Sequence, residues 1–376
     1  MLVIALNQQY IKKKKKIDNL HRHYSNKENN EDFGERLKNI NLEESDDNED
    51  EFEIENKIRK LENQKEYKKN KKSKKMEEEK EETKNPLSET EIVKNYIKEK
   101  NKTELVEYIC KLNNSERQKL KDLYISQYGE ELTKELDSLL SGDVRDLILG
   151  LMKTPIEFDA EKVYLSMKGL GTDEDTLSEI LATRSSRALI KIKDLYPELY
   201  KESLEDAIKG DTSKAYQKIL IAIIQGGRSD NPYPDTEKMK KIVENINEET
   251  DMQKDNIISY LVNCSYSEIC TICRLYEKKY EKNILDMIKK VLDDNDAYNF
   301  IKIMLECITN LGKFFAEKIK GFKSKDLIRI FVSQNEENME EIRDCYKALY
   351  NVELIEDIKK ETDGDFQTGL CILAQK

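Results

Sequence analysis

The chain has 376 residues, 38% of them charged, and contains only 13 glycines and 5 prolines. This length exceeds what one hydrophobic core usually serves, and this composition favours helices over β-sandwiches. The formal net charge is -11, and it belongs to the part of the chain after residue 84, because residues 1–84 hold equal numbers of basic and acidic side chains. An acidic globular part argues against direct binding to nucleic acid or to an anionic membrane, so contact with an acidic membrane would need a bridging cation.

Residues 1–85 are expected to form a charged, low-complexity tail. Basic blocks at Lys12–Lys16 and Lys65–Lys75 alternate with acidic stretches at Glu43–Glu55 and Glu77–Glu82, and apolar residues are too sparse to build a core. The tail is therefore predicted to be disordered or partly helical. A solvated tail is the simplest interpretation, and its polybasic blocks could also contact acidic lipid or act as an import signal.

From about Pro86 onward the chain shows helical patterning and an internal repeat. Four tyrosine pairs share the spacing i, i+4, which places both rings on one face of a helix. The pairs are Tyr124/Tyr128, Tyr196/Tyr200, Tyr276/Tyr280 and Tyr346/Tyr350, and they step by 72, 80 and 70 residues. The aliphatic residues Leu105, Leu177, Ile257 and Leu327, and also Leu132, Leu204, Ile284 and Leu354, step by the same intervals. The intervals indicate four copies of one unit. We expect the tyrosines to pack between helices rather than to form a ligand site.

We call these units repeats 1 to 4 and place them at residues 86–156, 157–231, 232–309 and 310–376. Each shows several short apolar segments of helical period and few strand signals. In repeat 2 the pattern predicts helices at Asp159–Lys168, Asp173–Thr183, Arg187–Leu195, Pro197–Lys209 and Ser213–Gln225. Asp159 and Asp173 suit helix N-caps or first turns, Pro155 closes repeat 1, and residues 226–234 form a linker.

One loop of repeat 2 is a candidate calcium site. Gly169 and Gly171 allow positive φ values at little cost, and a backbone bent in that way can turn several carbonyl oxygens inward. Calcium takes about 6–8 oxygen ligands. The carbonyls of Met167, Gly169 and Gly171, with a bidentate carboxylate from Asp211, would supply about five, leaving one or two positions for a phospholipid headgroup. The alternative is that the glycines only cap a helix and form a turn.

The chain has seven cysteines, an odd number, and most lie within apolar segments, which predicts reduced thiols in a cytoplasmic protein. Cys270 and Cys273 form a C-x-x-C pair. No second pair follows at zinc-ligand spacing and the only histidines, His21 and His23, lie in the tail, so we expect small side chains buried on a helix. No apolar run approaches the length of about 18 residues that spans a bilayer, so any membrane contact should be peripheral.

Repeat 2 resembles an annexin repeat. Three segments carry the resemblance in annexin order and spacing: M-K-G-L-G-T-D at 167–173, L-S-E-I-L-A-T-R-S at 177–185 and G-D-T-S-K-A-Y-Q at 210–217. The resemblance covers residues 86–376. It implies an all-α fold in which each repeat is a right-handed superhelix of five helices and the four repeats form a curved disc. It also implies calcium loops on the convex face that dock to acidic phospholipid.

In that family the positions of Met167, Gly169 and Gly171 give carbonyl ligands, and the position of Asp211 gives the bidentate carboxylate. The resemblance places Leu170 at the tip of the loop, where it can meet the lipid interface. Arg184 fills the family's usual arginine position and is expected to pair with interior acids or carbonyls.

The other repeats depart from this pattern. Repeat 1 has no glycine in Ile97–Thr103 and has Leu139 at the carboxylate position. Repeat 3 lacks both glycines in Asn245–Thr250, which a neighbouring Asp293 or Asp294 does not restore. We expect no calcium site in either.

Repeat 4 keeps one glycine and the acid, so Ile319, Gly321 and Glu361 form a candidate site of lower affinity. Beside the main site, Thr172 with Glu174 is a candidate for a minor second site. The alternative for that pair of positions is capping of the following helix by Asp173 and Glu174.

These features predict a calcium-dependent protein that binds acidic phospholipid, lies in the cytoplasm and moves to membranes when calcium rises. The alternative is a cytoskeletal or membrane-scaffold adaptor that depends little on calcium and binds its protein partner through residues 1–84. An enzyme is not expected, because residues 86–376 contain no histidine, no nucleophile paired with a base and no phosphate-binding G-x-x-x-x-G-K.

Overall fold

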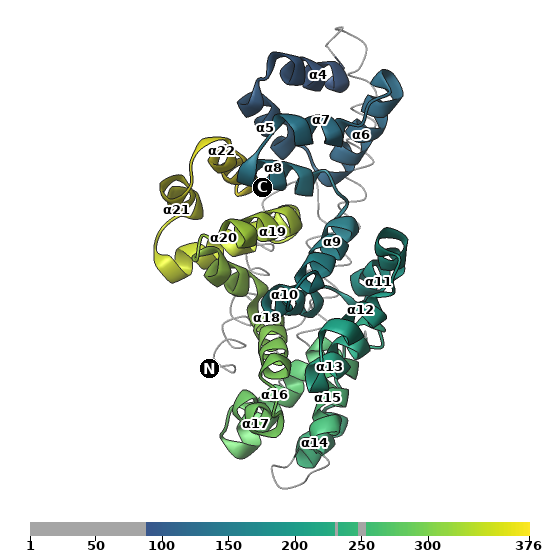
Figure 1. The fold of residues 1–376 in the computed structure, drawn as a ribbon. Coiled ribbons are helices and arrows are strands. Elements are labelled where there is room, and N and C mark those ends of the chain that lie inside the picture. Colours follow the sequence, from purple (N-terminus) through teal and green to yellow (C-terminus); the bar gives the residue numbers. More distant parts are fainter. Residues whose placement is uncertain (1–87, 230–231, 247–252) are drawn as a thin grey trace, which may run out of the picture. The chain divides into compact units, whose positions relative to one another are not determined.

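The computed structural model describes residues 88–229, 232–246 and 253–376, and there the only regular elements are 19 α-helices (Figure 1). The all-α class predicted from the sequence is therefore confirmed. The predicted charged tail, residues 1–85, and most of the repeat 3 loop, Asn245–Thr250, lie outside the described residues, so the expectations for them stay predictions.

Repeats 1 and 2 contain five helices each. Those of repeat 1 are α4 Glu89–Glu99, α5 Lys102–Lys111, α6 Asn114–Tyr128, α7 Leu132–Leu139 and α8 Gly142–Leu151. Those of repeat 2 are α9 Pro155–Met167, α10 Glu174–Thr183, α11 Ser186–Tyr200, α12 Leu204–Asp211 and α13 Lys214–Ile224.

Repeats 3 and 4 share one long helix. Repeat 3 contains α14 Thr236–Asn245, α15 Gln253–Asn263, α16 Tyr266–Tyr280, α17 Ile284–Val291 and the first part of α18 Asn295–Ile319. Repeat 4 contains the rest of α18, then α19 Ser324–Gln334, α20 Met339–Tyr350, α21 Leu354–Glu361 and α22 Gly364–Leu373. Asn310 breaks the helical dihedrals inside α18 (φ -162°, ψ 92°), and its Oδ1 accepts a hydrogen bond from the Lys313 backbone N–H. Each repeat therefore has five helical segments.

The first helices of repeats 1 and 2 begin at capping boxes. Ser88 caps α4 together with Glu91, and Thr154 caps α9 together with Glu157, so that each pair satisfies two orphan backbone N–H groups. Pro155, predicted to close repeat 1, instead opens α9 at its first position, where its missing N–H costs nothing.

The predicted break at Tyr196 is wrong, because α11 runs through Pro197 to Tyr200 and ends at Lys201 in the left-handed conformation (φ 63°). A proline inside a helix loses one backbone hydrogen bond. Packing outweighs that cost here: Tyr196 is buried, and Tyr200 stacks on Tyr164 with ring centroids 3.9 Å apart.

The tyrosine pairs pack as predicted. In every repeat the two rings of a pair lie 4.8 Å apart between centroids, and the first tyrosine of each pair is buried. Aromatic pairs at this separation add to the stabilisation from burial. The periodic tyrosines are thus structural, and this explains why they recur at the same place in each repeat.

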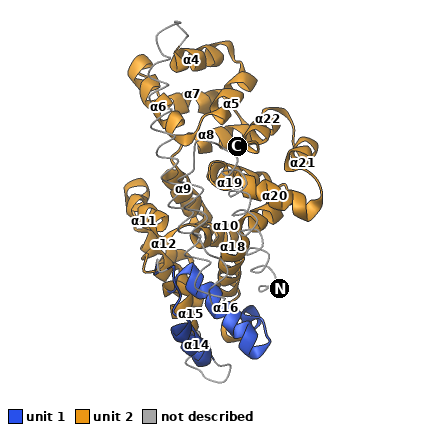
Figure 2. Ribbon diagram, turned by 180° about the vertical axis from the view of Figure 1, so that it is seen from behind, with its two compact units in different colours: residues 1–86, 229–256, 264–287 blue, residues 87–228, 257–263, 288–376 orange. Residues whose placement is uncertain are grey.

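Contacts divide the chain into two compact units (Figure 2). The smaller includes residues 229–256 and 264–287, and within it the Tyr280 hydroxyl donates to the Val243 carbonyl at 3.4 Å, joining α16 to α14. The larger comprises residues 87–228, 257–263 and 288–376. Repeat 4, repeats 1 and 2 over residues 87–228, and the loops of these three repeats belong to this larger unit.

Candidate calcium site in repeat 2

The loop between α9 and α10 is held by hydrogen bonds at its ends. The backbone N–H of Asp173 donates to the Ser166 carbonyl at 2.7 Å, which joins the two ends of the loop. The Asp173 side chain then caps α10 by accepting from the Thr176 backbone N–H at 3.1 Å, so the capping role predicted for Asp173 is confirmed. A short segment fixed at both ends can present its backbone in one conformation.

Both glycines of the loop use dihedral angles that suit no other residue well. Gly169 has φ +117° and Gly171 has φ +86°, and a Cβ at either position would meet no atom within 4 Å. The requirement for glycine is therefore conformational rather than steric. This observation favours the predicted bent loop over a simple helix cap.

The carbonyl oxygens of Met167, Gly169 and Gly171 accept no hydrogen bond from the described residues, whereas Ser166 in the same turn does. Carbonyl oxygens that accept no hydrogen bond are among the ligands that calcium prefers. Met167 itself is buried at the end of α9, so its backbone position is set by the core.

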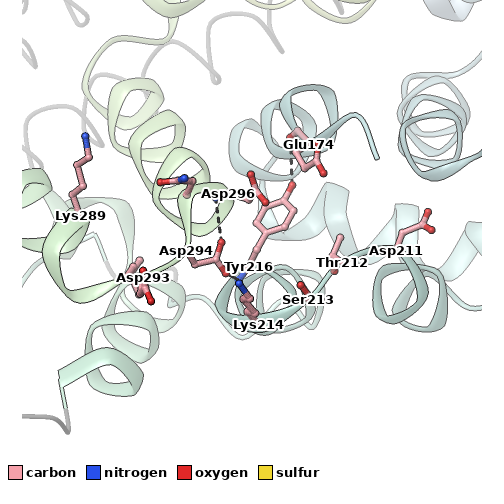
Figure 3. A pocket seen from close by; sticks show the side chains of 12 residues that line it. Glu174, Asp211, Thr212, Ser213, Lys214, Tyr216, Lys289, Asp293, Asp294 and Asp296 are labelled. Carbon is pink, nitrogen blue, oxygen red and sulfur yellow. Dashed lines mark hydrogen bonds between the residues drawn. The ribbon is translucent and has the colours of Figure 1, made fainter. Parts of the chain in front are cut away.

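Asp211 is the last residue of α12 and lies beside this loop. The Thr172 hydroxyl donates to the Asp211 backbone carbonyl at 3.0 Å, which ties the loop to the end of the helix. The Asp211 carboxylate is exposed and makes no ion pair or hydrogen bond with the described residues. Figure 3 shows it projecting from the end of α12 beside Thr212. The structure thus brings together the loop and the acid that are 44 positions apart in the sequence.

Leu170 at the tip of the loop is fully exposed, at 108% of its reference surface. Beside it, the Lys168 ammonium lies 5.2 Å from the centre of the Tyr164 ring. A fully exposed leucine between two glycines contributes nothing to the core, which fits the predicted role in membrane contact.

The candidate minor site uses residues that already have structural roles. The Thr172 hydroxyl is bonded to Asp211, and the Glu174 backbone carbonyl accepts the Tyr216 hydroxyl at 3.3 Å. Glu174 is half-buried and lines a cavity of about 510 Å³ with Asp211 and three further acids, Asp293, Asp294 and Asp296 (Figure 3). Asp294 also caps α18 and accepts the Tyr216 backbone N–H at 3.0 Å. The minor site remains a prediction.

The corresponding turn of repeat 4 is closed on itself. Ile319 ends α18, and its carbonyl accepts the Phe322 N–H at 2.9 Å. Gly321 does not adopt positive φ, and Phe322 does so instead (φ 45°). Glu361 ends α21 as Asp211 ends α12, and its carboxylate lies 3.3 Å from the Lys360 ammonium. Calcium binding by Ile319, Gly321 and Glu361 would require this turn to open, and it remains a prediction.

The turn of repeat 1 is closed, and that of repeat 3 lies mostly outside the described residues. After α4, Lys100 takes the left-handed conformation and the Asn101 N–H donates to the Tyr96 carbonyl at 2.9 Å. At the position of Asp211, the last residue of α12, helices α7 and α17 end in the apolar residues Leu139 and Val291.

Two acids of repeat 2, Asp159 and Glu179, are buried and form ion pairs. Arg184 donates to both carboxylate oxygens of Asp159, at 2.6 and 2.8 Å, which confirms that it pairs with an interior acid. Asp159 was expected at a helix start, and this was wrong: it lies inside α9, 4% exposed, where Arg184 compensates its charge. Glu179 of α10 pairs with Arg329 and Lys318, which sequence reasoning missed because nothing local links positions so far apart.

The described residues contain no cluster of three or more histidine, cysteine or acidic side chains suited to a metal, so a metal at the loop would depend on backbone carbonyls. No cysteine of the described residues forms a disulfide, and Cys273 is buried on α16 with Cys270 half-buried beside it, as predicted. No helix within the described ranges is long and apolar enough to cross a bilayer.

Comparison with known proteins decides the family. The sequence model of the Annexin family matches residues 91–151, 158–223 and 315–373. Annexin A1 of Bos taurus is 34% identical over 300 residues, covering 77% of this chain and 86% of the bovine one. The chain belongs to the annexin family. Annexin A1 isoform p37 of Columba livia is 32% identical and covers 72% of this chain and 81% of its own length.

Solved annexins have the same fold. The structure of annexin III superposes with a TM-score of 0.73 at 27% identity, covering 78% of this chain and 96% of that one. A calcium-bound annexin (Sm)1 superposes with a TM-score of 0.67 at 21% identity, covering 78% and 92%, which shows the fold alone. Calcium and phospholipid binding are characteristic of annexins, which are generally non-enzymatic proteins that associate peripherally with membranes.

Proposed function

We propose that this annexin binds acidic phospholipid membranes in a calcium-dependent way, mainly through repeat 2. The carbonyls of Met167, Gly169 and Gly171 and the carboxylate of Asp211 would hold the ion, and a lipid phosphate would complete its ligands. The observation that carries the proposal is that the loop has three carbonyls free of hydrogen bonds and is tied to the end of α12 by the Thr172 hydroxyl.

The charge of the protein explains why an ion is needed. The net charge is -11, so an acidic membrane repels the protein unless a cation lies between them. Calcium held by one negative side chain and neutral carbonyls keeps positive charge for a lipid phosphate. The protein would remain in the cytoplasm at low calcium and move to membranes as calcium rises.

The number of working sites sets the calcium threshold. Several weak sites on one protein gain from effective concentration at a surface. With one open loop in repeat 2 and candidate weaker sites at Ile319/Gly321/Glu361 and Thr172/Glu174, the calcium requirement should be higher than for an annexin with four open loops.

Co-sedimentation with vesicles tests the proposal. Wild type should sediment with phosphatidylserine vesicles as calcium is raised, and not with phosphatidylcholine vesicles. Asp211→Ala should need at least about tenfold more calcium, since it removes the only charged ligand. Glu205→Ala, an exposed acid on the same helix, is the matched control and should behave as wild type. Equal calcium requirements for Asp211→Ala and wild type would refute the mechanism.

An adaptor role through residues 1–84 is the second candidate. The closed turns of repeats 1 and 4 favour it, because they leave few places for calcium. In this case deletion of residues 1–84 would abolish localisation in cells while vesicle binding is retained, with a cytoskeletal or other protein as the partner.

A further inference from the structure

We propose that the Lys320 ammonium holds the α18–α19 turn of repeat 4 closed. The turn would then bind no calcium at concentrations that saturate the loop of repeat 2. Its ammonium joins the α18–α19 turn to α21, where calcium would join the loop and α12 in repeat 2. The inference rests on the proposed calcium site and adds the reason for its restriction to one repeat.

The contacts of Lys320 are internal. Its ammonium lies 2.6 Å from Oδ2 of the buried Asp357 in α21 and over the rings of Tyr346 and Tyr350, at 5.6 and 5.1 Å from their centres. The Tyr346 hydroxyl donates to the same Asp357 oxygen at 2.7 Å. The ammonium and this hydroxyl lower the pKa of Asp357 below its ordinary value, so the carboxylate stays charged and keeps the lysine.

Repeat 1 builds the same arrangement from a different lysine. Lys94 of α4 lies 2.9 Å from Glu135 and over the rings of Tyr124 and Tyr128, at 5.4 and 5.2 Å. The Tyr124 hydroxyl donates to Glu135 at 2.9 Å. Glu135 and Asp357 are each the fourth residue of an eight-residue helix, so the acids occupy equivalent positions. In both repeats a lysine ammonium pairs with this acid, although the two lysines are not equivalent in the sequence.

Repeat 2 lacks this arrangement. The fourth residue of α12 is Ala207, and the ring of Tyr164 stacks on Tyr200, whereas in repeats 1 and 4 a lysine ammonium lies over the second tyrosine of the pair. Lys168, which matches Lys320 in the sequence, forms no ion pair with the described residues. Without an acid at position 207 the loop lysine is not drawn to the helix, and the loop stays open.

The position of Lys320 explains its effect on the turn. It lies between Ile319 and Gly321, the two residues whose carbonyls would bind calcium, so anchoring its side chain also restricts their backbone. The turn hydrogen bond from the Phe322 N–H to the Ile319 carbonyl is then retained, and that carbonyl is unavailable. A fixed positive charge beside the turn also opposes a second cation.

Hydrogen exchange of the full-length chain, read by mass spectrometry with and without calcium and phosphatidylserine vesicles, tests the inference. The first variant, Asp357→Ala, copies the alanine of repeat 2. The second, Lys320→Met, keeps the Tyr346–Asp357 hydrogen bond, and because the Lys320 side chain is 42% exposed this variant should fold. Glu356→Ala, an exposed neighbour on α21, is the control.

In wild type, calcium should protect residues 167–173 and leave 319–324 unchanged. Without calcium, both variants should exchange the 320–322 amides roughly tenfold faster than wild type or the control, as expected for loss of a charged hydrogen bond. With calcium, the variants should gain protection at 319–324. Calcium protection of 319–324 in wild type at the concentration that protects 167–173, or no gain in both variants, would overturn the inference. If calcium does not protect residues 167–173 from exchange in wild type, the proposed function itself is refuted.

Discussion

Glu179 of α10 and Arg329 of α19 form a bidentate ion pair, with Nε–Oε1 and Nη2–Oε2 distances of 2.8 and 2.7 Å, although 150 residues separate them. Both side chains are almost completely buried, and Lys318 adds a third contact to Glu179 at 2.6 Å. Helix α10 starts directly after the candidate calcium loop, so this pair anchors the helix that follows the loop.

Replacing Glu179 by alanine should therefore destabilise the protein strongly. The change leaves the Arg329 guanidinium buried with only Asp326 as partner, and such losses typically cost about 3–5 kcal/mol. Chemical denaturation of Glu179→Ala and wild type measures the difference in unfolding free energy. Glu205→Ala, which breaks an exposed ion pair with Lys209, should cause no resolvable change, and an equal loss in both would contradict the argument.

The same pair should make stability depend on pH in the acid range. Burial by itself would raise the pKa of Glu179, but Arg329 and Lys318 lower it below its ordinary value. A carboxylate with a lowered pKa adds stability above the unfolded value of about 4.3, and this stability is lost as pH falls through the folded pKa.

Unfolding free energies measured from about pH 6 down to pH 3 should show this loss. Glu179→Gln should give a flatter curve than wild type over that range, because it has no proton to take up. Parallel curves for the two proteins would show that Glu179 does not contribute.

Gly171→Ala should weaken calcium binding with little effect on folding. A non-glycine residue held at positive φ costs about 1–3 kcal/mol, and here the loop can relax away from that conformation when no ion is bound. Calorimetric titration should show a loss of roughly tenfold in calcium affinity. Gly210→Ala is the control, since Gly210 lies inside α12 without positive φ and a Cβ there meets no atom.

Leu170→Ala should reduce membrane affinity but not calcium affinity. If the exposed leucine enters the lipid interface, losing it removes about 1–2 kcal/mol of apolar transfer energy, or roughly tenfold in vesicle binding. Flotation with phosphatidylserine vesicles at saturating calcium measures this. Leu123→Ala, which removes an exposed leucine from α6 in repeat 1, should bind as wild type does, and equal binding by Leu170→Ala would exclude insertion.

Much of the fold was accessible from the sequence because each repeat is specified locally. The tyrosine pairs fall on one helical face, and Asp173 marks the start of α10 by accepting a hydrogen bond from the backbone three positions away. Local rules failed where distant packing opposed them. Pro197 did not end α11 because Tyr196 and Tyr200 pack with Tyr164, and Asp159 was buried because Arg184 reaches it.

The sequence by itself determined the four-fold helical repetition and the bent loop around Gly169 and Gly171, because both depend on interactions within a few residues. Only the tertiary structure decided which loop is open. The turn after α18 is closed because Lys320 meets Asp357 from 37 residues away, and Arg329 finds Glu179 across 150. Such pairs form only when separate helices pack side by side. A charge that is buried on folding needs an opposite charge close to it in space, however far apart the two residues are in the sequence.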